Sequence, residues 1–271
     1  MLLNIAYKIY AILLSNGMSE ITENKLGDFQ MGFQPNRSTT DNIFMIWQIF
    51  EKCYEYNIEL HIFVDYSQAF DPVSRNKFIE CLIKYGVPKK LIMLIELTFT
   101  NTTAKVKIGN QLTREFRIVY GVKQGDPLSA TLFSIVIDNI IKQLDLKGNI
   151  STRLKQCSVY ADDILVTTRM MHVLEDTFQK QKEISQEVGL TINEHKMKYL
   201  RCTKKQHKMD GIDITQIHLE QVKSFKYLGS IVNGNNLTEE EIKERISLGN
   251  RAYYANQDLF KSKLLTRNSK L

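Results

Sequence analysis

Apolar positions along this chain follow two repeats: a helical spacing over most of its length and strict alternation in a few short stretches. Side chains about 3.6 residues apart share one face of a helix, and every second side chain shares one face of a strand. The helical spacing predicts helices that begin near Ser38, Ser74, Pro88, Pro127, His172 and Thr238. Alternating or continuous apolar runs predict strands over 60–66, 103–108, 116–120, 198–202 and 225–232, with two more between 159 and 168.

Residue types at the predicted helix ends support several of these boundaries. Ser38 can accept hydrogen bonds from the first turn of the helix that follows it. Gly86 stands at a suitable C′ position for the helix that begins at Ser74. Thr238 and Glu241 have the spacing of a capping box, which predicts the start of the last helix.

The N-terminal stretch MLLNIAYKIYAILLSNG is apolar but interrupted by polar residues, and it is too short to span a bilayer. It also lacks the basic start of a signal peptide, so we expect an amphipathic helix that packs on the rest of the protein. No repetitive or linker-like tract marks a domain boundary. The predicted elements together indicate an α+β fold with an antiparallel sheet and helices on one side of it.

The net charge and the cysteines indicate which kinds of partner and which cellular compartment suit this chain. The chain has 271 residues, with 36 Lys and Arg against 30 Asp and Glu and a formal net charge of +6. This excess suits a polyanionic partner such as nucleic acid, although many basic proteins have none. The four cysteines form no CxxC pair, which indicates reduced thiols in an intracellular, non-secreted protein: Cys53, Cys81, Cys157 and Cys202. We expect a cytoplasmic or nuclear location without a membrane partner.

Two adjacent acidic residues interrupt the strand-like stretch VYADDILVTT at 159–168. Asp162 and Asp163 would repel each other inside a strand, but a hairpin tip would expose their oxygens to water and to a cation. Asp65 stands at the end of the strand predicted for 60–66, so all three carboxylates could converge on one divalent metal site. For the pair taken alone, a plain polar turn is the more frequent explanation.

Three motifs give the acidic pair a context: YADD at 160–163, FVDYSQAFD at 63–71 and GVKQGDPLSATLF at 121–133. In this combination the chain resembles reverse transcriptases, and specifically the non-LTR (LINE-type) retrotransposon branch. The resemblance also includes QMGFQPNRSTTDNIF at 30–44, GLTINEHKMKYL at 189–200 and FKYLGSIV at 225–232. It therefore covers nearly the whole chain.

The resemblance implies a polymerase palm, with an antiparallel sheet and packed helices, partial fingers and little or no thumb. Residues 1–58 would be partial fingers, and residues 59–235 the catalytic palm, with inserted fingers elements at about 74–120. Residues 236–271 would be a C-terminal helix at the start of the connection to a thumb. The upstream fingers strands and the endonuclease domain of such elements are expected to be absent, which makes the domain truncated.

The resemblance also implies the metal ligands and their ions. Asp65 and Asp162 would hold two catalytic Mg²⁺ ions, for which Mn²⁺ is a possible substitute. Asp163 would belong to the same acidic cluster, and the backbone carbonyl of Tyr66 would be a further ligand.

Five more residues would bind the nucleotide if the resemblance holds. Phe70 would be the steric gate that excludes a 2′-hydroxyl, while Gln124 and Gly125 would line the incoming base and the template. Lys196 and Arg37 would contact phosphates. From residue type alone, Phe70 could equally be a core residue, QGDP a plain turn with an N-cap, and the two cations solvated surface residues.

Several positions depart from the family pattern. Gln34 replaces a basic residue of the fingers, Gln68 replaces a lysine, and Ala130 stands where a proline is usual. None of these changes removes an implied metal ligand. They indicate sequence drift, which bears on activity more than on ancestry.

The predicted function is that of an RNA-directed DNA polymerase, which transfers dNTPs to the 3′-hydroxyl of a DNA primer on an RNA template by a two-metal mechanism. The alternative is an inactive, truncated retrotransposon remnant that only binds nucleic acid. A metal-dependent nuclease stays open, because metal pairs serve both chemistries. A two-carboxylate hydrolase would leave the Gln124–Gly125 loop unexplained. Zinc is not favoured, because His195, Cys202 and His207 have loose spacing and no fourth ligand. Template choice and oligomeric state stay open.

Overall fold

The structure is a computed structural model, and it describes residues 3–56, 58, 60–67, 70–144, 156–192, 197–204, 211–214 and 217–262. For residues 60–67 and for Gln156 it describes the backbone alone. Within these ranges, every helix is too short or too polar to cross a membrane.

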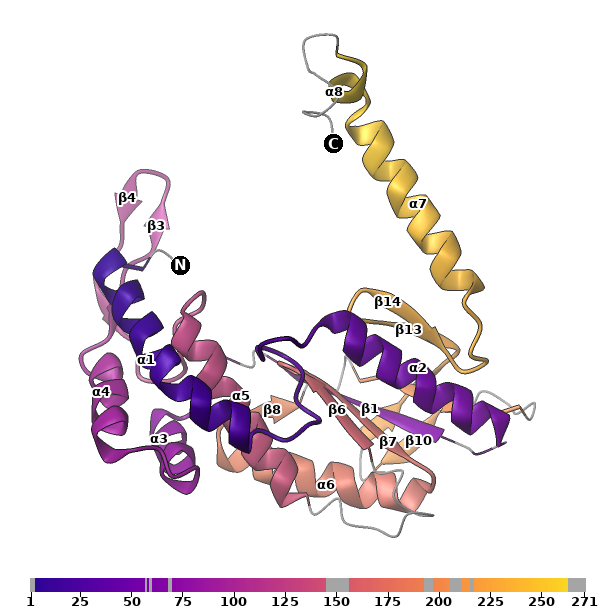
Figure 1. Ribbon diagram of the computed structural model, residues 1–271, viewed down its shortest axis with the longest axis horizontal. Coiled ribbons are helices and arrows are strands. Elements are labelled where there is room, and N and C mark those ends of the chain that lie inside the picture. The colour runs from indigo at the N-terminus through magenta and orange to yellow at the C-terminus, as the bar shows by residue number, and fades with distance from the viewer. Residues whose placement is uncertain are drawn as a thin grey trace.

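A six-stranded sheet forms the centre of the molecule, with the strand order β12-β9-β1-β7-β6 and with β8 also paired to β1 (Figure 1). Its strands are β1 (Leu60–Ser67), β6 (Gln156–Tyr160), β7 (Asp163–Thr168), β8 (Thr191–Ile192), β9 (Tyr199–Cys202) and β12 (Gln221–Val222). The pairs are antiparallel, except that β12 runs parallel to β9. The strands predicted over 60–66, 159–168 and 198–202 are confirmed.

Helices cover both faces of this sheet, which corrects the expectation that they lie on one side. Helix α2 (Thr39–Glu55) lies over one face, and helices α5 (Pro127–Gln143) and α6 (Met171–Glu187) lie over the other (Figure 1). The reason is visible in β7: Leu165 packs with the α2 side, whereas Ile164 and Val166 pack with the α5 and α6 side. Strand residues point alternately to opposite faces, so a continuous apolar run needs cover on both.

Helix α1 (Ile5–Lys25) packs against α5, as expected for an amphipathic N-terminal helix. Its Ala11, Leu14 and Met18 are buried, and its Asn4 N-cap accepts a hydrogen bond from the backbone N–H of Ala6. Two shorter helices, α3 (Arg75–Lys84) and α4 (Lys89–Phe99), complete this side of the molecule.

Small two-stranded sheets lie around this body. The strand predicted over 103–108 forms two short strands: β2 (Thr103–Ala104) pairs with β5 (Phe116–Arg117), and β3 (Lys107–Ile108) pairs with β4 (Gln111–Leu112). Strand β10 (Ile212–Ile214) pairs with β11 (Ile217–Leu219). The strand prediction for 225–232 resolves into a hairpin of β13 (Ser224–Tyr227) and β14 (Ser230–Asn233).

Helix α7 (Glu239–Ala255) extends away from the body and is followed by the short helix α8 (Gln257–Lys261) (Figure 1). The capping box predicted at its start is wrong, because the Thr238 side chain makes no capping hydrogen bond. Glu241 instead accepts hydrogen bonds from the backbone N–H of Ile231 and from Arg245 Nε, both at 2.6 Å. The carboxylate is therefore used to attach the helix to β14.

Candidate active site

The acidic pair lies at the tip of the β6–β7 hairpin. Tyr160 pairs with Asp163, so Ala161 and Asp162 form the turn between the two strands. Ala161 has a φ of 60°, in the left-handed region that type I′ and II′ hairpin turns use. Both aspartates are half-buried. Asp162 therefore belongs to the turn, and only Asp163 is part of the strand.

The neighbouring strand β1 brings Asp65 beside this tip. In the β1–β7 ladder, Asp65 is directly opposite Asp163. Directly opposed residues of antiparallel strands have Cα atoms roughly 4.5–5.5 Å apart. Two residues far apart in the sequence, and both able to supply carboxylates, therefore meet at one end of the central pair of strands.

Two further predicted site residues relate to this end of β1. Tyr66 pairs with Ile192 of β8, directly after the position of Asp65. Lys196 lies outside the described residues, but the chain before and after it pairs with β1: Ile192 is opposite Tyr66, and Leu200 is opposite Ile62.

Phe70 lies between two other aromatic rings. Its ring centroid is 4.5 Å from that of Phe133 on α5, and 6.4 Å from the exposed ring of Phe33 in an edge-on arrangement. The Phe70 side chain is only half-buried, although it packs against the core cluster. Phe70 thus contacts the core on one side and remains partly accessible.

The loop that contains Gln124 and Gly125 is tied to the segment after β1. The backbone N–H of Gly121 donates to the Val73 carbonyl at 2.8 Å, and that of Val122 donates to the Phe70 carbonyl at 3.1 Å. Gly121 has a φ of 69°, and a Cβ atom there would lie 2.4 Å from the Asp71 carbonyl oxygen. This close approach requires glycine and fixes the start of the loop.

The tip of this loop is open. Gln124 and Gly125 are exposed, and the space around Gly125 is empty. The next residue, Asp126, caps α5 by accepting from the backbone N–H of Leu128 at 3.1 Å. The plain turn and N-cap that the sequence allowed are therefore present, and the loop tip remains free to contact a ligand.

Lys123, Tyr7 and Asp126 form a group that sequence reasoning missed. Lys123 Nζ lies 3.5 Å from the centroid of the Tyr7 ring, and the Tyr7 hydroxyl donates to Asp126 Oδ2 at 2.7 Å. Burial lowers the pKa of Lys123, whereas burial and the hydrogen bond to Asp126 raise the pKa of Tyr7. No local pattern marks this group, because Tyr7 comes from α1, far away in the sequence.

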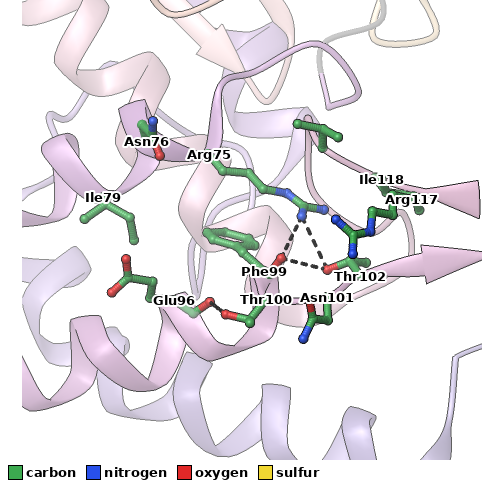
Figure 2. Close-up of a pocket in the computed structure, with 11 residues that line it drawn as sticks. Arg75, Asn76, Ile79, Glu96, Phe99, Thr100, Asn101, Thr102, Arg117 and Ile118 are labelled. Atoms are coloured by element: carbon green, nitrogen blue, oxygen red, sulfur yellow. Dashed lines mark hydrogen bonds between the residues drawn. The ribbon is translucent and has the colours of Figure 1, made fainter.

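Arg75 was missed as well, and Figure 2 shows its surroundings. Its Nη1 donates to the Phe99 carbonyl at 2.8 Å and to Thr102 Oγ1 at 3.3 Å, and its Nε donates to the Gly121 carbonyl at 3.1 Å. The guanidinium lies 5.2 Å from the centroid of the Phe99 ring and borders a pocket of about 310 Å³. Arg75 therefore links α3, the end of α4 and the loop of Gln124.

Arg37 is exposed, and its Nη2 lies 3.7 Å from Asp28 Oδ1. Among the described side chains, no cluster of three or more His, Cys, Asp or Glu is present, and this set does not include Asp65. Cys202 is buried, while His195 and His207 lie outside the described residues.

Comparison with known proteins identifies the family. Residues 1–232 match the family described as "Reverse transcriptase (RNA-dependent DNA polymerase)". A curated relative is the Retrovirus-related Pol polyprotein from type-2 retrotransposable element R2DM of Drosophila melanogaster, 27% identical over 176 residues, which are 62% of this chain and 16% of the relative. Another, from type-1 retrotransposable element R2 of Popillia japonica, is 30% identical over 115 residues, or 41% and 18% of the two chains. The chain thus covers less than a fifth of the length of either relative.

Solved structures show the same fold. Apo telomerase from Candida tropicalis, truncated from its C-terminal domain, superposes with a TM-score of 0.61 at 14% identity, over 85% of this chain and 44% of that one. The predicted α+β fold of the polymerase palm type is confirmed. Because the family match spans most of its length, this chain belongs to the reverse transcriptase family and is related to the Pol polyproteins of R2 retrotransposable elements.

Proposed function

We propose that this chain catalyses RNA-directed DNA synthesis, the transfer of dNTPs to the 3′-hydroxyl of a primer. The observation that carries the proposal is the pairing of Asp65 with Asp163 across β1 and β7, with Asp162 in the adjoining turn. Membership in the reverse transcriptase family gives the reaction class. The pairing of Asp65 with Asp163 supports this end of the sheet as the site where the reaction takes place.

The residues at this end of the sheet fit divalent metal ions of the hard, oxygen-binding kind. Asp65 and Asp162 would hold two Mg²⁺ ions, with Asp163 in the same cluster and the Tyr66 carbonyl as a further oxygen ligand. Mn²⁺ has similar ligand preferences and is the expected substitute. When bound, two such ions supply charge stabilisation for the attacking and leaving oxygens of the transfer. Asp162 and Asp163 are half-buried, so both residues are partly accessible from solvent.

The neighbouring residues would bind and orient the nucleotide. We assign Phe70 as the steric gate, because its half-buried ring is held by Phe133 and by the backbone link from Val122. That same link supports Gln124 and Gly125 as contacts for the base and the template. Lys196 and Arg37 are assigned to phosphates on the basis of their motifs.

The assigned partners are an RNA template, a DNA primer and dNTPs. A net charge of +6 favours a polyanion, because neutralised phosphates release counterions. A telomerase with this fold has been solved in complex with a TWJ fragment of telomeric RNA. The four buried, unpaired cysteines support a reducing, intracellular compartment. We likewise assign residues 1–58 to fingers, 59–235 to the palm with inserted fingers elements at about 74–120, and 236–271 to the connection toward a thumb.

Primer extension on poly-rA with an oligo-dT primer tests the proposal. The wild-type chain should incorporate dTTP in Mg²⁺, and Asp65→Asn and Asp162→Asn should each reduce incorporation by at least about 100-fold. Asp176→Asn is the matched control, since Asp176 is exposed on α6. Equal incorporation by all four proteins would refute the assignment.

The alternative is a chain that only binds nucleic acid. The positive net charge supports binding whether or not the acidic cluster is active. Fluorescence anisotropy with a labelled RNA–DNA hybrid in EDTA separates the two functions. Binding at low salt by the wild type and both acidic variants, without Mg²⁺-dependent extension by any of them, would establish the binding-only alternative.

A further inference from the structure

The segment Phe29–Gly32 lies beside β6, the strand at one end of the central sheet. Strands β6 and β7 form the acidic hairpin, whose turn carries Asp162. The backbone N–H of Met31 donates to the Val159 carbonyl at 2.8 Å, and the N–H of Val159 donates to the Phe29 carbonyl at 2.9 Å. Gln30 and Val159 form a parallel β-bridge between the same segments. This segment therefore continues the central sheet by a short stretch, next to the turn that carries Asp162.

Gly32 touches the acidic turn itself. A Cβ atom at position 32 would lie 2.4 Å from the backbone nitrogen of Ala161 and 3.0 Å from the carbonyl carbon of Tyr160. Both atoms are main chain and form the peptide bond between Tyr160 and Ala161, one residue before Asp162. Gly32 is not among the residues with positive φ, so glycine is needed here for space and not for an unusual backbone conformation.

Two observations indicate that the turn depends on this contact. Ala161 adopts a left-handed φ of 60° although it has a side chain, and such residues persist only where the surroundings hold them. The segment that contacts the turn is also held in place. Gln30 is fully buried, and its Oε1 accepts a hydrogen bond from the backbone N–H of Gly32 at 3.0 Å. The main chain at Gly32 is thus held against the peptide between Tyr160 and Ala161.

We propose that Gly32 is a positioning residue, which presses on the Tyr160–Ala161 peptide and so fixes where Asp162 stands relative to Asp65. The inference rests on the proposed polymerase function for its catalytic consequence. The mechanical part, that the segment Phe29–Gly32 braces the acidic turn, is independent of that function.

Gly32→Ala tests the proposal, because the added methyl group must displace the turn. A misplacement of about 1 Å at a reacting centre costs on the order of 100-fold in rate, so kcat for dTTP incorporation should fall about that much. KM for primer–template should change little, since the hybrid is held mainly by phosphate contacts elsewhere. Hydrogen exchange of the metal-free protein is the second readout: amides of 157–164 should exchange about tenfold faster.

Gly234→Ala is the matched control. A Cβ at Gly234 would lie 2.5 Å from the Arg201 carbonyl oxygen, a main-chain conflict of similar severity outside the acidic hairpin. It should lower thermal stability without a selective change in kcat or in the exchange of 157–164. A general loss of stability in both variants with the same loss of kcat would overturn the proposal.

Gln30→Met keeps the test decisive if Gly32→Ala does not fold. Methionine has similar length, but its thioether is only a weak acceptor for the Gly32 N–H, so exchange at 157–164 should rise in the same direction and less strongly. Unchanged exchange in Gln30→Met and in any folded Gly32→Ala would overturn the brace. Faster exchange in a protein whose wild type does not extend primers would support the brace and refute the polymerase function.

Discussion

Single polar side chains connect parts of this protein that are distant in sequence, and Arg75 is the clearest example (Figure 2). Its guanidinium donates to the carbonyls of Phe99 and Gly121 and to the hydroxyl of Thr102. Burial lowers the pKa of Arg75, which remains a cation at physiological pH because the ordinary pKa of arginine is so high. The planar fork places donors on separate nitrogens, so Nε and Nη1 reach acceptors from different segments, whereas the three donors of a lysine share one nitrogen.

Arg75→Lys should therefore lower the free energy of unfolding by about 2 kcal/mol, since lysine cannot reach both carbonyls at once. Urea unfolding followed by circular dichroism measures the change. Arg117→Lys is the control, because Arg117 borders the same pocket and is exposed; its effect should stay within about 0.5 kcal/mol. Equal effects of the two substitutions would contradict the role given to Arg75.

At the scale of the elements, a helix cap formed by residues within one turn could be predicted from the sequence. Contacts between elements that are distant in sequence could not. Ser38 and Asp41 form the capping box of α2, because both partners lie within one turn of each other. Glu241 had the same kind of spacing but binds Ile231 of the docked hairpin and Arg245 from the next turn of its own helix, and not the N-cap backbone.

In the candidate site, too, features set by a short stretch of sequence were predicted, and features set by packing were missed. The hairpin tip at Asp162 and Asp163 follows from residue types in a short stretch, and the convergence with Asp65 was expected from the predicted strand ends and from the resemblance. The register that sets Asp65 opposite Asp163 comes from the structure. The role of Gly32 could not be predicted, because a glycine in a loop looks the same whether it permits a turn or a close approach. Arg75 and Tyr7 were missed because their partners are set by helix packing, which no local spacing records.

The attachment of α7 to the β13–β14 hairpin gives a prediction at this scale. Burial opposes ionisation of Glu241, but the hydrogen bonds from Ile231 and Arg245 prevail and hold its pKa below the usual value. Glu241→Gln should therefore weaken the attachment by about 1–3 kcal/mol, and amides at the start of α7 should exchange faster. Hydrogen exchange with mass spectrometry measures this, and exposed Glu240→Gln serves as the control.

The sign of its pH dependence follows from the lowered pKa. The stabilisation by Glu241 is present above the carboxyl's ordinary pKa of 4.5 and is lost as the pH falls through the lower folded-state value. Acidification should thus loosen α7 in the wild type and change little in Glu241→Gln. A wild-type helix whose exchange protection did not respond to acid would contradict the attachment.

At the scale of the whole molecule, the central sheet lies between two apolar clusters, and each cluster contains two of the four cysteine thiols. Cys53 and Cys202 lie in the cluster on the α2 side, and Cys81 and Cys157 in the cluster on the α5 and α6 side. Burial raises the pKa of Cys81 to about 11 and that of Cys157 and Cys202 to about 12. These thiols stay protonated in the folded protein at a pH where an unfolded chain would ionise them.

Stability should therefore fall as the pH rises from about 9 toward 11. Below the ordinary thiol pKa of 9.0 both states are protonated, and above it the unfolded state binds fewer protons, so unfolding becomes more favourable until the folded thiols ionise. Urea unfolding across this range measures the slope. Cys157→Ala should make the slope shallower, and an unchanged slope would show that other groups cause the loss.

The position of β1 at the middle of the sheet has a consequence for synthesis on the ribosome. Its described partners, β7, β8 and β9, all come later in the chain, the nearest beginning at Asp163. Asp65 therefore leaves the ribosome well before the described strands that pair with its own. Because domains fold as units during translation, β1 must wait as an unpaired apolar segment, and the acidic end of the sheet is completed only after β7 and β8 have been synthesised.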